Sequence, residues 1–378
     1  MDAVSNAKGG TSLSEIAKVF FKLGCIGFGG PAVHIAMMEE EVVRKRKWIS
    51  GEHFLDLVGA TNLIPGPNST EMTMHCGQER AGWKGLVVAG VCFIFPAVVI
   101  TAILAWAYQK YGGLADVQPF LYGIKPAIIS VIVALMISLG RKALKSVTLG
   151  VIGALAAILT LFGANEIYVL FGAGFVGIVL YLFTPRQTVN GFAPAVLLAI
   201  HQAAELTNWK TFVIFLKVGS ILYGSGYVLF AFLDAELVMK GWLSKQQLID
   251  AIAVGQFTPG PVFSAATFIG WQLGGFWGAT AATVGIFLPS FLLVAFLNPL
   301  IPLLRRSKVM SAFLDTVNIA SVAIILAVAV EMGKQTFLDW RTVVIAILGF
   351  VITFHFRKLN SGFVVLGGAA LGYLLWWL

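Results

Sequence analysis

The stretch KLGCIGFGGPAVHIAMMEEEVV at residues 22–43 recurs in diverged form as KVGSILYGSGYVLFAFLDAELV at residues 217–238. The same register continues for many residues downstream, with an offset that drifts by only two positions. The downstream matches are Trp48 with Trp242, Ser50 with Ser244, Asp56 with Asp250, Pro65, Gly66 and Pro67 with Pro259, Gly260 and Pro261, and Pro96 with Pro289. Matches of this extent indicate an internal duplication that covers most of the chain.

The composition indicates a membrane protein. Of 378 residues, 58% are hydrophobic and 12% are charged, whereas soluble domains average about 25% charged residues. The net charge of +8 comes from short Lys and Arg clusters between apolar runs, which is typical of topology signals and not of nucleic-acid binding. No cleavable signal peptide is evident. The three scattered cysteines predict neither a disulfide nor a metal site, and no cofactor is expected.

Apolar runs long enough to span a bilayer occur in matched positions of both halves. The runs are 86–108, 120–139, 147–162 and 167–183, then 279–298, 311–330, 342–356 and 362–378. Each half begins with two shorter runs that Gly and Pro interrupt, at 14–36 and 53–78, then at 211–233 and 247–271. We predict an all-α polytopic membrane protein with about six segments per repeat. The predicted domains are a first repeat (1–190), a linking membrane segment (191–209) and a second repeat (210–378).

The distribution of basic residues predicts that the two repeats have opposite orientations. The loop 141–145 is rich in Lys and Arg, but its equivalent 331–341 has balanced charge. Conversely, 110–118 is poor in basic residues and its equivalent 305–308 is rich. By the positive-inside rule the second repeat is inverted, which requires the segment 191–206 to cross the membrane. The N-terminus is then cytoplasmic and the C-terminus lies outside.

Glycine and proline interrupt the first apolar segments at GFGGP (27–31) and IPGPNST (64–70), with copies YGSG (223–226) and TPGP (258–261). Irregular backbone in a bilayer is tolerated only where it lines a cavity or is buried in protein. A helix that begins there presents free N–H groups and the positive end of its dipole to an anion. Interrupted helices in inverted repeats therefore predict a transporter binding site. The alternative is that they are plain kinks or tight hairpins that permit close helix packing.

We predict that these interruptions and their neighbours form one anion pocket. Its predicted residues are Lys22, Gly27, Phe28, Gly29, Gly30, Asn62, Pro65, Gly66, Pro67, Asn68, Ser69, Thr70, Lys217, Tyr223, Gly224, Ser225, Gly226, Gln256, Thr258, Pro259 and Gly260. Lys22 and Lys217 would attract the anion, or else extend their amines to the membrane surface. Asn62 and Gln256 would bind an oxyanion or cap the broken helices.

Ionisable residues near the interruptions are candidates for coupling or gating. They are His34, Glu39, Glu41, Glu71, His75, Asp234 and Glu236. Ionisable groups within membrane segments are often functional, and histidine exchanges protons near neutral pH. The alternatives are structural hydrogen bonds for the histidines and, for Glu39 to Glu41, local pairs with Arg44 and Lys45 at a solvated helix end. We also expect Lys125 to pair with Asp315.

Two stretches, FKLGCIGFGGPAVHIAMMEEEVVRKRKWIS (21–50) and NLIPGPNSTEMTMHCGQERAGWKGLVVAGVCFIFPA (62–97), resemble the chromate ion transporters of prokaryotes. The resemblance covers nearly the whole chain, although the second copy reads YGSG in place of FGGP. It implies the two-domain form of the family, with antiparallel halves. The implied activity is proton- or gradient-coupled export of chromate, and also of sulfate, across the cytoplasmic membrane. A homodimer is expected, because dimers are common among such carriers.

The sequence bears on four functions other than a gradient-coupled carrier. A passive anion channel and a carrier for a different oxyanion fit the same repeats and remain alternatives. An intramembrane enzyme is not expected, because no Ser/Lys, paired-Asp or HExxH constellation occurs. No Walker A sequence is present either, so this chain is not expected to pump with ATP.

Overall fold

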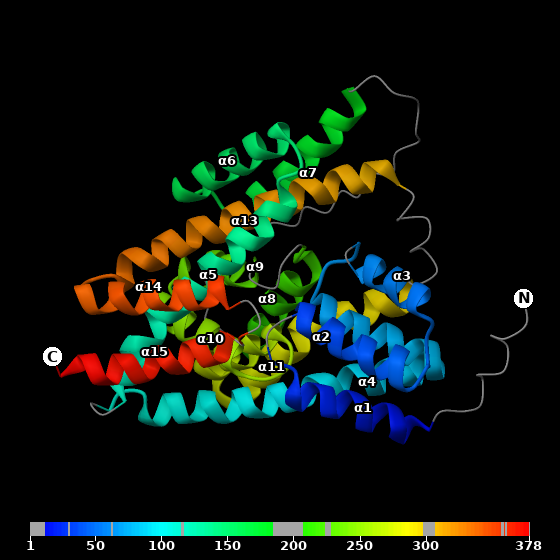
Figure 1. Ribbon diagram of the computed structural model, residues 1–378, viewed down its shortest axis with the longest axis horizontal. Coiled ribbons are helices and arrows are strands. Elements are labelled where there is room, and N and C mark those ends of the chain that lie inside the picture. Colours follow the sequence, from blue (N-terminus) through cyan, green and yellow to red (C-terminus); the bar gives the residue numbers. More distant parts are fainter. Residues whose placement is uncertain are drawn as a thin grey trace, which may run out of the picture.

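The structure is a computed structural model that describes residues 12–28, 31–61, 63–114, 117–183, 207–223, 228–297, 307–356, 359 and 361–377 (Figure 1). These residues form helices and no β-strand. In the first copy the elements are α1 (Leu13–Ile26), α2 (Pro31–Met38), the π-helix η1 (Glu39–Lys45), α3 (Gly51–Thr61), α4 (Asn68–Tyr111), α5 (Gln118–Ala143), α6 (Val147–Leu161) and α7 (Glu166–Phe183).

The second copy repeats this order element by element. It contains α8 (Asn208–Ile221), α9 (Val228–Leu233), the π-helix η2 (Asp234–Val238), α10 (Lys245–Phe257), the short 3₁₀ turn η3 (Val262–Ser264), α11 (Ala265–Leu297), α13 (Lys308–Thr336), α14 (Trp340–His355) and α15 (Ser361–Trp376). Among the described residues, five helices are long and apolar enough to cross a membrane. The predicted all-α membrane fold with two repeats is therefore confirmed.

Both long helices that follow a PGP turn are sharply folded at a glycine. In α4 the fold is at Gly82, with φ +59°, and in α11 it is at Gly275, also with φ +59°. A Cβ on Gly77 would lie 2.3 Å from the carbonyl oxygen of Gly85, so the segments before and after the fold lie against each other. Residues 68–80 are called the first half-helix, and the equivalent residues 262–273 the second half-helix.

The interrupted segments of the first copy are hairpins that enter and return on the same side. Glu15, near the start of α1, pairs with Arg46, just beyond η1, at 3.6 Å. His53, near the start of α3, lies 3.2 Å from Glu79, near the end of the first half-helix. Because the two ends of each segment meet, the described residues of the interruptions, 27–28 and 63–67, are at the tips of these hairpins. The interrupted runs that the sequence predicts are therefore re-entrant segments in the first copy, which leaves the number of crossings even.

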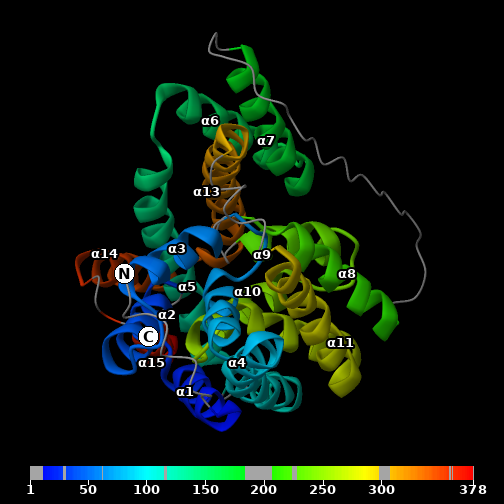
Figure 2. The same cartoon turned by 90° about the vertical axis from the view of Figure 1, so that its right-hand side faces the viewer.

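The last helices of each copy pack on the other copy. α6 and α7 lie on α13, and α14 and α15 lie on α5 (Figures 1 and 2). The two copies also meet directly where α4 contacts α11. This reciprocal exchange relates the copies by an approximate two-fold axis. Residues 191–206 of the predicted linking segment (191–209) lie outside the described residues.

Close backbone approach anchors the first helix of each copy. A Cβ on Gly24 would lie 2.5 Å from the carbonyl oxygen of Phe93, and a Cβ on Gly219 would lie 2.4 Å from that of Ile286. Only glycine permits this contact between α1 and α4, or between α8 and α11. On the outer helices α6 and α7, large apolar side chains such as Val151 and Phe175 are more than half exposed, as expected for a surface that faces lipid.

Candidate anion site

The hairpin tips of the two copies bond to each other through their backbones. The N–H of Gly66 donates to the carbonyl oxygen of Leu222 at 2.8 Å, and the N–H of Gly260 donates to that of Gly27 at 2.7 Å. Gly66 aligns with Gly260, and Gly27 aligns with Leu222. The two bonds are therefore the same contact made twice across the approximate two-fold axis, and they bring together described residues at or beside all four interruptions.

The backbone at these tips suits glycine and proline. Gly66 has φ +139° and Gly260 has φ +92°, values that residues with a Cβ rarely adopt. Pro31 is the first residue of α2, and Pro67 precedes the first residue of the first half-helix. The carbonyl of Pro67 accepts from the N–H groups of Thr70 and Glu71. The first half-helix therefore begins at the tip, where first-turn N–H groups have no intrahelical acceptor.

Buried polar atoms without a hydrogen-bond partner gather around this junction. They are the hydroxyl oxygens of Thr70, Thr258 and Ser290, both carboxyl oxygens of Glu71 and both ring nitrogens of His75, and each of these side chains is at most 4% exposed. Buried polar atoms are nearly always paired in proteins. A cluster of unpaired ones at a helix start is what a site for a polar ligand requires.

The first half-helix supplies most of these atoms. Glu71 and His75 align with Ala265 and Ile269, which have no polar side-chain atoms. Thr70 aligns with Ser264, whose hydroxyl oxygen lies 3.3 Å from that of Thr101 in a bond between the copies. The polar part of the site is therefore asymmetric, although the backbone around it is symmetric.

Sequence reasoning missed Ser290. This residue follows the matched proline Pro289 and aligns with Ala97. A Cβ on Gly66 would lie 2.4 Å from its hydroxyl oxygen and 2.2 Å from a carboxyl oxygen of Glu71, so both side chains stand beside the first tip. A serine directly after a proline that is matched in both copies was the available signal.

The predicted lysines bind carboxylates beside the hairpins. Lys22 pairs with Glu41 at 3.2 Å, and Lys217 pairs with Glu236 at 2.6 Å. Burial would raise the pKa of Glu41, but the hydrogen bond from Lys22 and the charges of Arg46, Lys22 and Lys45 hold it below its usual value. In each copy this ion pair joins the first helix to the π-helix that follows the interruption. An anion-attracting role for Lys22 and Lys217 stays a prediction.

The remaining candidates lie at various distances from the junction. A ring nitrogen of His34 is 2.8 Å from the carbonyl oxygen of Gly27. Glu39 binds Arg44 at 3.1 Å, and Asp234 binds Lys245 at 2.8 Å. Ser69 and Gln256 are buried. Gly29, Gly30, Asn62, Gly224, Ser225 and Gly226 lie outside the described residues.

The expected pair of Lys125 and Asp315 is wrong. Asp315 binds Lys145 at 2.7 Å, while the charge of Lys125 acts on Asp250 of α10. Asp250 also accepts a hydrogen bond of 2.6 Å from the hydroxyl of Tyr108. Asp250 belongs to α10, which packs against α5, so an acid from the second copy that the sequence did not single out interacts with Lys125.

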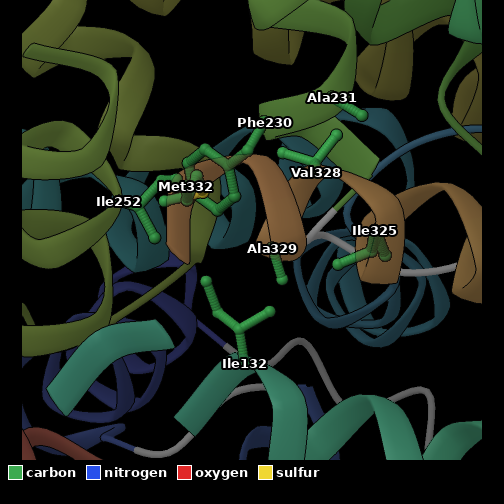
Figure 3. Close-up of a pocket in the computed structure, with 8 residues that line it drawn as sticks. All are labelled: Ile132, Phe230, Ala231, Ile252, Ile325, Val328, Ala329 and Met332. Atoms are coloured by element: carbon green, nitrogen blue, oxygen red, sulfur yellow. The ribbon is translucent and has the colours of Figure 1, made fainter. Parts of the chain in front are cut away.

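A cavity between α5, α9, α10 and α13 is apolar (Figure 3). Its volume is about 10 Å³, and its lining residues are Ile132, Phe230, Ala231, Ile252, Ile325, Val328, Ala329 and Met332. That volume holds no more than about one water, and the lining offers no donor to an anion. This cavity is therefore no candidate for an anion site. Among the described residues, no group of three His, Cys, Asp or Glu side chains is placed to hold a metal ion.

The fold and its junction define a polytopic helical membrane protein with two matched repeats whose broken helices meet. The sequence profile of the chromate transporter family matches residues 14–178 and 209–373, so the chain belongs to that family.

Named relatives cover almost the whole chain. It is 28% identical to a probable chromate transport protein of Synechococcus elongatus, over 97% of this chain and 96% of that protein. Chromate transport proteins of Cupriavidus metallidurans and Pseudomonas aeruginosa are 28% and 29% identical, each over 96% of this chain and 92% of the relative. No solved structure gives a significant match.

Proposed function

We propose that this chain is a secondary active transporter that exports chromate, and related oxyanions such as sulfate, across the cytoplasmic membrane. The pair of reciprocal backbone bonds, Gly66 to Leu222 and Gly260 to Gly27, carries the proposal. These bonds place two half-helix starts and several unpaired hydroxyl groups at one junction. Helix N-termini and hydroxyl donors are the groups that bind a tetrahedral oxyanion in a protein interior, and relatives named as chromate transport proteins support chromate as the substrate.

Alternating access follows from the same contacts. The two tip bonds join the copies at one place, while the exchanged helices α6, α7, α14 and α15 hold the copies together elsewhere. Rocking one set of hairpins against the other would open the junction to each side in turn, as in other carriers built from inverted repeats. In this proposal the N-terminus is cytoplasmic and the C-terminus lies outside, as the basic loops predict.

Uptake into proteoliposomes tests the proposal. Purified protein is reconstituted, and labelled chromate or sulfate uptake is measured with and without an imposed pH gradient and membrane potential. We expect saturable uptake that concentrates the anion above equilibrium. Flux that only dissipates the anion gradient would favour the channel alternative, and no protein-dependent flux of either anion would reject transport of both. The control is Gly172→Ala, because a Cβ on Gly172 meets no atom within 4 Å.

A further inference from the structure

The first half-helix carries a row of three ionisable side chains at Glu71, His75 and Glu79. Positions four residues apart share one face of a helix, and each step rises by about 6 Å along the axis. The row therefore runs from the hairpin tip, where Glu71 stands beside Gly66, to the opposite end of the half-helix.

Exposure to solvent changes steadily along this row. Glu71 is 0% exposed and His75 is 1% exposed, whereas the side chain of Glu79 is 35% exposed and lies 3.2 Å from His53 of α3. His53 is also near enough to His75 to act on its charge. Groups that exchange protons therefore extend from the solvated end of the hairpin to the buried junction.

The second half-helix shows that the fold does not need this row. Its equivalent residues are Ala265, Ile269 and Leu273, all apolar. Yet the second half-helix ends in the same sharp bend at a glycine and makes the same tip contact. Polar residues that only one of two structurally matched helices carries point to function, because buried ionisable groups within a membrane are costly to keep.

Glu71 competes with an anion for the same place. Its carboxyl group stands at the start of the first half-helix, beside Gly66 and the hydroxyl of Ser290. Tyr223, just beyond the end of α8, is a titratable group from another element that interacts electrostatically with Glu71. An ionised Glu71 would repel a bound oxyanion at close range in a medium of low dielectric constant, so the oxyanion binds best when Glu71 is protonated.

We propose that Glu79, His75 and Glu71 relay a proton from one side of the membrane to the anion site, so that a proton and an oxyanion bind together. A proton passes from Glu79 to a ring nitrogen of His75. The other ring nitrogen releases a proton to the carboxylate of Glu71, which leaves His75 neutral again. The Glu79 end of the half-helix carries Arg80, and Lys84 follows it. The positive-inside rule therefore assigns this end to the cytoplasm.

This relay rests on the proposed function, and it has an electrical consequence. A dianion that moves with one proton carries a single net negative charge. A membrane potential that is negative inside would then favour export by about 2.3 kcal/mol per 100 mV. The relay thus names the coupling ion of the proposed carrier and the side on which it loads.

Equilibrium binding measures the link between proton and anion. Binding of labelled chromate to purified protein is followed between about pH 6 and pH 8, where histidines and coupled groups titrate. By reciprocal linkage, we expect wild-type affinity to rise as pH falls, by up to about tenfold per pH unit for one proton. In Glu71→Gln, the only pH dependence of affinity that should remain is the one caused by protonation of chromate itself. A wild-type profile identical to that of Glu71→Gln would overturn the linkage.

Proton flux measures the relay itself. Chromate-dependent proton movement is followed with a dye trapped in proteoliposomes that contain Glu79→Gln or His75→Gln. We expect both variants to keep the equilibrium pH dependence of binding but to move protons at least about tenfold more slowly, since a positioned acid or base contributes about 10²-fold or more. The matched control is Glu52→Gln, an exposed acid beside His53 that lies off the row.

The outcomes separate the relay from the proposed function. If wild-type protein binds no chromate at any pH, the proposed function fails. If it binds and transports chromate, but both Glu79→Gln and His75→Gln move protons at the wild-type rate, the relay alone fails. Should Glu71→Gln not fold, as size-exclusion chromatography would show, the His75→Gln and Glu79→Gln flux measurements still decide.

Discussion

The two half-helices, residues 68–80 and 262–273, have the same backbone and different chemistry. Both follow a PGP turn, both fold back at a glycine with φ +59°, and both bond through a tip glycine to the opposite copy. Only the first carries buried ionisable groups. Duplication has therefore kept the glycines and prolines that build the junction in both copies, while the polar groups that would act on a ligand are concentrated in one.

The largest expected effect tests what the copies share. Gly24→Val and Gly219→Val each insert side-chain atoms where a Cβ already lies within 2.5 Å of a carbonyl oxygen. We expect each to lower the free energy of unfolding by about 3 kcal/mol or more, measured by thermal unfolding in detergent and by yield. Gly367→Ala, in open space, is the control. If only one of the two valine variants were destabilised, the packing of the copies would not be equivalent.

The next effect tests how the copies differ. Thr70→Ala removes an unpaired buried hydroxyl, whereas Ser264→Ala removes a hydroxyl that already pairs with Thr101. A hydrogen bond to a charged group is worth about 1.5–3 kcal/mol, so we expect Thr70→Ala to weaken chromate binding by about ten- to a hundredfold. Ser264→Ala should change it by less than about threefold. Equal losses in a binding isotherm would contradict the asymmetric site.

A pH-dependent effect tests the matched ion pairs. Burial would raise the pKa of Glu236, but hydrogen bonds from Lys217 and Lys240, and their charges, hold it below its ordinary value of 4.5. A carboxylate with a lowered folded-state pKa stabilises the fold above its unfolded pKa, and this contribution disappears as pH falls through the folded value. Both lysines are two-fifths exposed or more, so we expect Glu236→Gln to cost only about 1 kcal/mol at neutral pH.

Thermal unfolding of wild type and Glu236→Gln should therefore differ at pH 7 and converge below pH 4.5, the ordinary value for glutamate. Glu41→Gln should behave alike, because Lys22, Lys45 and Arg46 surround Glu41 in the first copy. A difference that persists unchanged in acid would show that the ion pair is not its source.

The smallest effect concerns two contacts between the copies, each of which joins a helix residue of one copy to a residue near a helix end of the other. Lys145 binds Asp315 at 2.7 Å, and Tyr122 donates to Asp339. The lysine is 60% exposed, so we expect Lys145→Ala to change the free energy of unfolding by less than about 1 kcal/mol. Tyr122→Phe should cost about the same, by the usual value of one hydrogen bond. Chemical denaturation of both variants measures these changes in the free energy of unfolding. A larger decrease from either variant would show that its contact is a main stabilising contact between the copies.

Much of the scaffold was predictable because backbone needs leave marks in sequence. The PGP turns require positive φ at Gly66 and Gly260, and a bilayer restricts where such turns occur, so their recurrence pointed to the junction. The local pair of Glu41 and Lys45, at 3.5 Å, was also predicted because it depends only on helix periodicity.

Contacts between distant helices were not predictable in the same way. Ser290 stands beside Glu71 only because α11 of the second copy reaches the tip of the first. The sequence predicted a pair of Lys125 with Asp315 because the repeat places them at nearby equivalent positions. In the structure Asp315 pairs with Lys145. Which side chains meet across such an interface depends on helix rotation and crossing, and apolar periodicity does not determine either to within one side chain.

The exchange of helices between the copies also constrains the order of synthesis. The surface that α6 and α7 cover belongs to α13, which the ribosome completes more than a hundred residues later. Until then the first copy has its hairpins and α5 but lacks the partners of its last two helices. Native assembly must therefore wait for the second copy to enter the bilayer, so the chain reaches its final packing late, as one cooperative unit.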